Sequence, residues 1–238
     1  GAADKPAAVP RASARRAGWR LPLAGRTSKG KAMVNILPIG AGVSIAALLP
    51  MDAPETEWDN YQVVFATDDG DVRRNALSDF GSVRANGKIA MKLPEGIRLI
   101  NARICSVDDD VMLTTRLGKA IRFPATDVRV FKGRDSTGVR GIRLGGDDEV
   151  VSMAIIRHFE ATPDERAAYL KMRRAVAGAL EEEVEADEDD EMGEGSFELG
   201  QARYVEMSEA EDLILTITER GAGKLSSSHD YPVRGRGG

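Results

Sequence analysis

Apolar residues along this chain fall into short runs, rich in β-branched side chains, that are separated by polar turns containing glycine. In residues 63–74 an apolar run leads into a turn closed by Gly70, and a second short run carries cations. The same sequence pattern recurs at residues 111–122 and again at residues 213–224. Two short runs joined by a glycine turn are typical of a β-hairpin. The sequence therefore predicts three hairpins of one kind.

A second half-unit precedes each hairpin and consists of a cationic loop, a short strand, a turn and another strand. The expected pairs of strands are 32–37 with 43–49, 89–93 with 98–104, and 141–144 with 149–155. Each full unit then holds four short strands, and one four-stranded sheet per repeat is the pattern of a propeller blade. A repeat of about fifty residues indicates a radial or solenoid array. The predicted fold class is all-β, a propeller-like array of four-stranded blades.

The repeat also sets the expected boundaries along the chain. We expect a flexible tail at residues 1–17, blades at about residues 24–80, 81–131 and 133–231, and the start of a further blade at residues 232–238. Residues 19–22 resemble the closing strand of a unit whose beginning is missing. The chain is therefore interpreted as a fragment of a larger array.

Residues 160–212 interrupt the strand pattern within the third blade. Thr162, Pro163 and Glu165 predict the start of a helix, because they place a capping residue, a first-turn proline and a capping-box glutamate in order. We expect this helix to continue to about Leu180 and to be followed by a disordered acidic run at residues 181–194. The fold prediction thus includes a helical and acidic insertion.

Acidic and basic side chains are concentrated in different parts of the chain, which the net charge of −5 does not show. Residues 160–212 hold 18 acidic and 5 basic side chains, whereas the rest of the chain holds 28 basic and 20 acidic ones. A basic array is suited to a polyanionic partner. Two interpretations of the acidic run stay open: a solubilising linker, or a DNA mimic that competes for the basic surface.

Other classes of site find little support in the sequence. Cys105 lies among apolar residues and is expected to be a buried thiol rather than a nucleophile. His158 and His229 are isolated, which argues against a metal site or a general base. The aspartates at 68–69 and 108–110 are expected to be turn residues. There is no Walker-type phosphate loop, and no apolar run is long enough to span a membrane.

Several segments of the sequence together resemble the C-terminal domain of the DNA gyrase A subunit. They are residues 213–224 followed by 226–228 and 235–238, and residues 28–38 preceded by 19–23. The resemblance covers about residues 18–160 and 195–238, and the insertion is similar to one found in some bacterial branches of the family. A Gln/Arg-rich and Gly-rich box expected in the first blade of the family is absent. Residues 234–238 are similar to it in composition but lie in another blade.

The resemblance implies a β-pinwheel whose basic perimeter binds and wraps double-stranded DNA, supporting ATP-dependent negative supercoiling by a bacterial, cytoplasmic type IIA topoisomerase. It implies two protein partners, a second A subunit plus the gyrase B subunit, through parts that this chain lacks. It implies no cofactor here, with ATP and Mg²⁺ used elsewhere in the complex. The fragment itself is expected not to cleave DNA, since Tyr61, Tyr169, Tyr204 and Tyr231 do not stand in the context of the catalytic tyrosine. The alternatives are the equivalent domain of topoisomerase IV and a propeller-type protein-interaction scaffold.

Candidate DNA contacts are the cations that recur at equivalent places in the repeat, where they would neutralise phosphates along a curved rim. The loop set is Arg26, Lys29, Lys31, Arg84, Lys88, Arg134 and Arg140. The hairpin set is Arg73, Arg74, Arg116, Lys119, Arg122 and Lys224, joined by Arg234 and Arg236 near the end of the chain. Some hairpin cations could instead block edge-to-edge strand pairing. Gly30, Gly87 and Gly138 either let backbone amides approach phosphates or permit a positive φ in turns.

Overall fold

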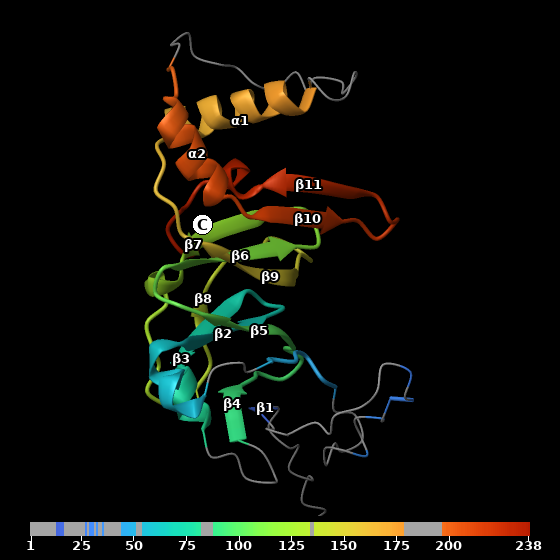
Figure 1. Cartoon of the computed structure of the whole chain (residues 1–238). Coiled ribbons are helices and arrows are strands. Elements are labelled where there is room, and N and C mark those ends of the chain that lie inside the picture. Colours follow the sequence, from blue (N-terminus) through green and yellow to red (C-terminus); the bar gives the residue numbers. More distant parts are fainter. Residues whose placement is uncertain are drawn as a thin grey trace, which may run out of the picture. The chain divides into compact units, whose positions relative to one another are not determined.

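The computed structural model describes residues 13–16, 27, 29, 30, 32, 35, 44–50, 54–81, 88–133, 136–178 and 197–238. These residues form two compact units. The first unit extends to Ile155 and includes Arg234–Gly238, and the second unit is Ile156–Val233. Most of the regular structure is β-strand (Figure 1), as the sequence predicts.

The first unit contains three sheets. A four-stranded sheet has the order β5 (Leu99–Cys105), β2 (Gln62–Thr67), β3 (Asp71–Ala76) and β8 (Val139–Arg140), with antiparallel neighbours throughout. A three-stranded sheet has the order β7 (Ala120–Pro124), β6 (Asp109–Thr115) and β9 (Val150–Arg157). A two-stranded sheet pairs β1 (Ser13–Arg16) with β4 (Lys88–Lys92), so part of the expected flexible tail forms a strand.

The strands of one sheet are not consecutive in sequence. The hairpin β2–β3 is completed on one side by β5, which belongs to the next repeat, and on the other side by β8, which belongs to the repeat after that. The expectation of four consecutive strands per sheet is therefore wrong. The reason is physical: short amphipathic strands of the same kind compete for each edge, and their pattern does not specify the partner. The blade boundaries drawn from the sequence stay predictions.

All three predicted hairpins are confirmed, and they share one turn. The turn glycines have positive φ: 86° at Gly70, 86° at Gly118 and 84° at Gly221. In each turn a threonine Oγ1 accepts a hydrogen bond of 3.1 Å from the N–H four residues later, at Thr67, Thr115 and Thr218. A left-handed conformation favours glycine, which explains why glycine stands at this position in every copy.

The half-units before the hairpins are predicted less well. The expected strands 89–93, 98–104 and 149–155 are confirmed as β4, β5 and β9. Residues 141–144 are bends and coil, with the short β8 immediately before them. Residues 44–49 contain no strand, and most of 32–37 lies outside the described residues.

The four-stranded sheet is covered on both faces. Val64 and Ala66 of β2 belong to one buried apolar cluster, while Val63 and Phe65 belong to another. Alternate residues of a strand point to opposite faces, so both faces of this sheet pack against a core. In the central part of β2 and β3, side chains on both faces of the sheet are therefore buried.

Cys105, at the end of β5, is 3% exposed, as the sequence predicts. Burial, helped by the nearby Asp109 charge and opposed by Arg74, raises the pKa of its thiol to about 11 from an ordinary 9.0. The native state therefore keeps a proton that the unfolded chain loses above pH 9, so the free energy of unfolding should fall between about pH 9 and 11. Urea unfolding across this range tests it. The Cys105→Ala variant should lack this part of the decline, and an equally steep decline would contradict the assignment.

The second unit contains α1 (Pro163–Gly178), α2 (Gln201–Glu209) and the hairpin of β10 (Leu213–Ile217) with β11 (Gly223–Ser227). The predicted capping box is confirmed: Thr162 N–H donates to Glu165 Oε2 at 2.7 Å, and Glu165 N–H donates to Thr162 Oγ1 at 3.2 Å. The sequence missed α2, whose N-cap Gly200 makes no side-chain cap. The expected acidic run at 181–194 lies outside the described residues.

The core of the second unit explains one of the isolated histidines. Tyr169, Leu199 and Met207 form its buried cluster. His229 lies 4.9 Å from the ring of Tyr169 in an edge-on arrangement, and its Nε2 is 2.9 Å from the Met207 carbonyl oxygen. Among the described residues, no group of three His, Cys, Asp or Glu side chains is placed to hold a metal ion. No helix of the described part of the chain is long and apolar enough to cross a membrane.

Candidate nucleic-acid interface

The predicted cations divide into three groups in the structure. The exposed ones are Lys29, Arg116, Lys119, Arg140, Lys224, Arg234 and Arg236. The buried ones are Arg73, Arg74 and Arg122. Arg26, Lys31, Arg84 and Arg134 lie outside the described residues, as does the side chain of Lys88.

Arg74 and Arg122 hold equivalent positions on the second strands of two hairpins, and both are internal. The Arg74 guanidinium donates to the Val128 carbonyl at 2.6 Å and to Gln62 Oε1 at 2.8 Å. Arg122 Nε donates to Asp110 Oδ2 at 2.7 Å, with 3% and 0% of the two side chains exposed. A buried guanidinium that is hydrogen-bonded to internal partners does not reach a phosphate. The expectation that Arg74 and Arg122 contact DNA is therefore wrong for this structure. Asp109 and Asp110 are strand residues of β6 rather than turn residues.

Arg73 is the third buried cation, with 0% of its surface exposed. Its guanidinium bonds to the backbone of Gly133 and Ser136, on the loop that follows β7. Because it is buried, Arg73 is also excluded from the residues that contact DNA directly. The sequence pattern placed these arginines on the surface because the pattern along a strand does not show which of its positions are covered by other parts of the fold.

The exposed Arg116 belongs to a network of ion pairs at the hairpin turns. Arg98 pairs with Asp68 at 2.9 Å and with Glu149 at 3.1 Å, and Arg116 lies 3.9 Å from the same glutamate. Asp68 and Arg116 are equivalent turn residues, and their N–H groups donate to the carbonyls of Arg98 and Glu149. The same contact therefore occurs in both repeats, with the acidic residue in the turn in one of them (Asp68 with Arg98) and the basic residue in the turn in the other (Arg116 with Glu149). Arg98 is 67% exposed and was not predicted.

Arg140 and Arg236 also have partners within the first unit. Arg140 pairs with Asp71 at 3.3 Å and donates to the Asp69 carbonyl. Burial raises the pKa of Asp71, and the Arg140 charge opposes that shift. Arg236 donates to the Asp127 carbonyl at 3.2 Å and to the Arg140 carbonyl. These two arginines stabilise loops as well as carrying exposed charge.

A cation-lined hollow of about 570 Å³ lies in the first unit. Its charges come from Lys119 immediately before β7, Arg143 after β8 and Arg234 near the chain end. The backbone brings these segments together, because Arg234 N–H donates to the Arg122 carbonyl at 2.8 Å and Gly237 N–H donates to the Gly141 carbonyl at 2.9 Å. No acidic side chain lines the hollow within the described residues. Arg143 was missed, because it does not stand at a recurrent position.

Comparison with known proteins agrees with this architecture. The family "DNA gyrase C-terminal domain, beta-propeller" matches residues 61–106, 109–157 and 212–238. The DNA gyrase A subunit of Granulibacter bethesdensis is 49% identical over 229 residues, covering 92% of this chain and 24% of that protein. The corresponding protein of Rickettsia bellii is 41% identical over 220 residues, with the same coverage. This chain thus spans about a quarter of the length of these relatives.

Among solved structures, the C-terminal domain of DNA topoisomerase IV has a TM-score of 0.57 at 18% identity, covering 87% of this chain and 48% of that one. At this identity the likeness concerns the fold alone, and it supports the propeller-like array of strands. The sequence likeness is to gyrase, which decides between the two related families. The family match covers all three repeated hairpins, and this chain therefore belongs to the DNA gyrase C-terminal domain family, which has a β-propeller fold.

Proposed function

We propose that this chain binds double-stranded DNA as the wrapping module of the A subunit of DNA gyrase, in support of ATP-dependent negative supercoiling. The observation that carries the proposal is the hollow lined by Lys119, Arg143 and Arg234 without an acidic side chain. Clustered cations without carboxylates attract phosphates, and phosphate contacts bind DNA without reading its sequence. The bending of the duplex, which costs on the order of several kcal/mol, is offset by further contacts of this kind.

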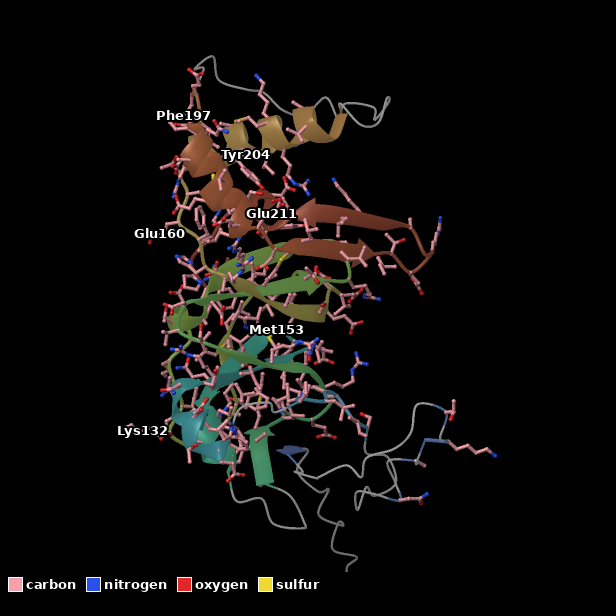
Figure 2. All side chains as sticks on the ribbon, viewed as in Figure 1. Lys132, Met153, Glu160, Phe197, Tyr204 and Glu211 are labelled. Carbon is pink, nitrogen blue, oxygen red and sulfur yellow. The ribbon has the colours of Figure 1, made fainter. Side chains whose placement is uncertain are left out.

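The scaffold alternative is less well supported. Protein interfaces are enriched in exposed aromatic anchors. In the described part of the chain, the one strongly exposed Phe or Trp side chain is Phe197, in the second unit (Figure 2). In the described part of the first unit, the exposed surface carries cations such as Arg116 and Lys119 rather than Phe or Trp rings.

The remaining expectations follow from the same proposal. The partners are double-stranded DNA, the gyrase B subunit, and a second A subunit; the site of action is the bacterial cytoplasm, at the chromosome. This chain holds no cofactor of its own, and ATP and Mg²⁺ act elsewhere in the complex. The acidic run at residues 181–194 acts either as a linker or as a DNA mimic. Removing its negative charge by Glu-to-Gln changes distinguishes the two, because only a DNA mimic would make the DNA affinity rise when its charge is removed.

Binding of a linear duplex by the full 238-residue chain, measured by fluorescence anisotropy across a salt series, tests the proposal. The double variant Lys119→Gln/Arg143→Gln should weaken binding to all sequences alike. It should also lower the slope of log affinity against log salt by about 2, roughly one unit for each phosphate that is no longer neutralised.

The matched control is Lys171→Gln/Arg174→Gln, which removes the same charge from exposed positions of α1. It should leave the slope unchanged. Absence of DNA binding by the folded chain, or equal effects of both double variants, would contradict the proposal.

A further inference from the structure

The segment Arg234–Gly238 lies beside β7 (Figure 1, at the mark C) and contributes Arg234 to the cation-lined hollow. Its backbone is bonded to the first unit by Arg234 N–H, which donates to the Arg122 carbonyl at 2.8 Å, and by Gly237 N–H, which donates to the Gly141 carbonyl at 2.9 Å. Three of its five residues are glycines, which restrict the backbone least and have no side chain to pack. The segment therefore depends on its two arginines for side-chain contacts.

Arg236 makes the side-chain contacts that hold this segment. Its Nε donates to the Asp127 carbonyl at 3.2 Å, and its Nη1 donates to the Arg140 carbonyl. Its backbone N–H donates to Asp127 Oδ2 at 3.4 Å. Asp127 is the last residue of the short helical turn Ala125–Asp127 after β7, and Arg140 lies on β8. One guanidinium therefore ties the segment to two separate elements of the first unit.

The two elements that Arg236 contacts are themselves held in place. Arg140 pairs with Asp71 of β3 in the four-stranded sheet, and the side chains of these two residues form an ion pair at 3.3 Å. The turn that contains Asp127 is closed by a bond of 3.1 Å from Val128 N–H to the Ala125 carbonyl. The positions of both carbonyls that accept from the Arg236 side chain are therefore set by the fold.

Arg234 differs from Arg236, although both are exposed arginines of one segment. Arg234 lines the hollow together with Gly235 and Gly238, whereas Arg236 is not among the lining residues. Among the described residues, the Arg234 side chain has no hydrogen-bond or ion-pair partner, so its donors are open to a phosphate. Its place at the hollow therefore depends on the backbone that carries it, and Arg236 holds that backbone.

We propose that Arg236 is a positioning residue for DNA binding, which holds Arg234 at the hollow so that Arg234 contacts a backbone phosphate. Arg236 acts on DNA through Arg234 and does not contact the phosphate itself. The inference rests on the proposed function, because it assigns roles within the hollow. Lysine at position 236 would keep the charge, but one ammonium group on a flexible stem does not replace a planar guanidinium that bonds to two carbonyls at once.

The variant Arg236→Lys tests this role at constant net charge. In duplex binding by the full chain across a salt series, it should lower the slope of log affinity against log salt by about 1, the value of the phosphate contact that Arg234 loses. The control Arg174→Lys makes the same exchange at an exposed position of α1 and should keep the wild-type slope. A wild-type slope for an Arg236→Lys chain that is folded by circular dichroism would overturn the positioning role.

Combination with Arg234→Gln separates positioning from direct contact. Arg234→Gln alone should lower the salt slope by about 1, and Arg234→Gln/Arg236→Lys should lower it by the same amount, because the second change acts only through Arg234. A further fall in the double variant would overturn the inference. If Arg234→Gln keeps the wild-type slope while Lys119→Gln/Arg143→Gln lowers it, the inference fails and the proposed function stands. If the folded chain binds no duplex, both fail.

The arginine Nε–H signals of the ¹⁵N-labelled wild-type chain provide a test that does not depend on the folding of Arg236→Lys. The Arg236 Nε–H should exchange slowly with water, since it donates to the Asp127 carbonyl. During titration with a short linear duplex, the Arg234 signal should shift with the same saturation curve as the anisotropy signal, and the Arg236 signal should stay in place. An unmoved Arg234 signal, or an equal shift of both signals, would overturn the inference.

Discussion

Replacement of Asp110 by alanine is expected to lower the free energy of unfolding by about 3–5 kcal/mol. Asp110 and Arg122 form a buried ion pair at 2.7 Å, and neither side chain is more than 3% exposed. Alanine would leave the Arg122 guanidinium inside the first unit without its carboxylate partner. The loss of a charge partner in a dry interior costs far more than the loss of an exposed pair, which contributes about 0–1 kcal/mol. Urea unfolding followed by circular dichroism measures the change.

The chain itself provides the control for this prediction. Leu213 and Leu225 hold the positions of Asp110 and Arg122 in the third hairpin. The double variant Asp110→Leu/Arg122→Leu should therefore recover most of the lost stability, because replacing both partners by apolar residues is often neutral. A double variant as unstable as Asp110→Ala would show that the pair has a role beyond its own charges.

Replacement of Gly138 by alanine should cost about 2–3 kcal/mol or more. A Cβ built on Gly138 lies 2.3 Å from the Val72 carbonyl oxygen and 2.7 Å from the Val72 carbonyl carbon. Both neighbours are backbone atoms of β3, so the clash is relieved only if β8 moves away from the sheet. Gly138 does not have a positive φ, and the interpretation of this glycine as a turn residue of that kind is wrong. It is required by the close approach of two backbones.

The matched control is Gly30→Ala. Gly30 was placed by the sequence at the equivalent loop position, but a Cβ there meets nothing within 4 Å among the described residues. Alanine at this position should change stability by no more than about 0.5 kcal/mol. Thermal unfolding of both variants separates the two effects, and a Gly138→Ala chain with the wild-type melting temperature would contradict the packing argument.

The features predicted from sequence are those encoded locally. The hairpin turns depend on one glycine with a positive φ, and the start of α1 depends on Thr162 and Glu165 within one turn. By contrast, the pairing of β8 with β3 joins residues that are far apart, and nothing in either strand identifies the other. The helix α2 was missed because it begins at Gly200 without a side-chain cap.

The candidate site shows the same division. Recurrence along the repeat selected Lys119, which is exposed and lines the hollow with Arg234. It also selected Arg73, Arg74 and Arg122, since a repeat places residues at equivalent positions without showing whether those positions are covered. Burial depends on the second layer of packing, which the pattern along a single strand does not contain.

The exchange of strands between repeats has a consequence for synthesis of the chain. During translation β2 and β3 leave the ribosome before β5 and β8 (Val139–Arg140), and their sheet is complete only after both of these strands have emerged. Until then both outer edges of the first hairpin stay open to pairing with other nascent chains. Contacts of this sequence separation also slow folding. A stop or pause in translation between β3 and β8 is therefore the stage at which this chain is most prone to aggregate.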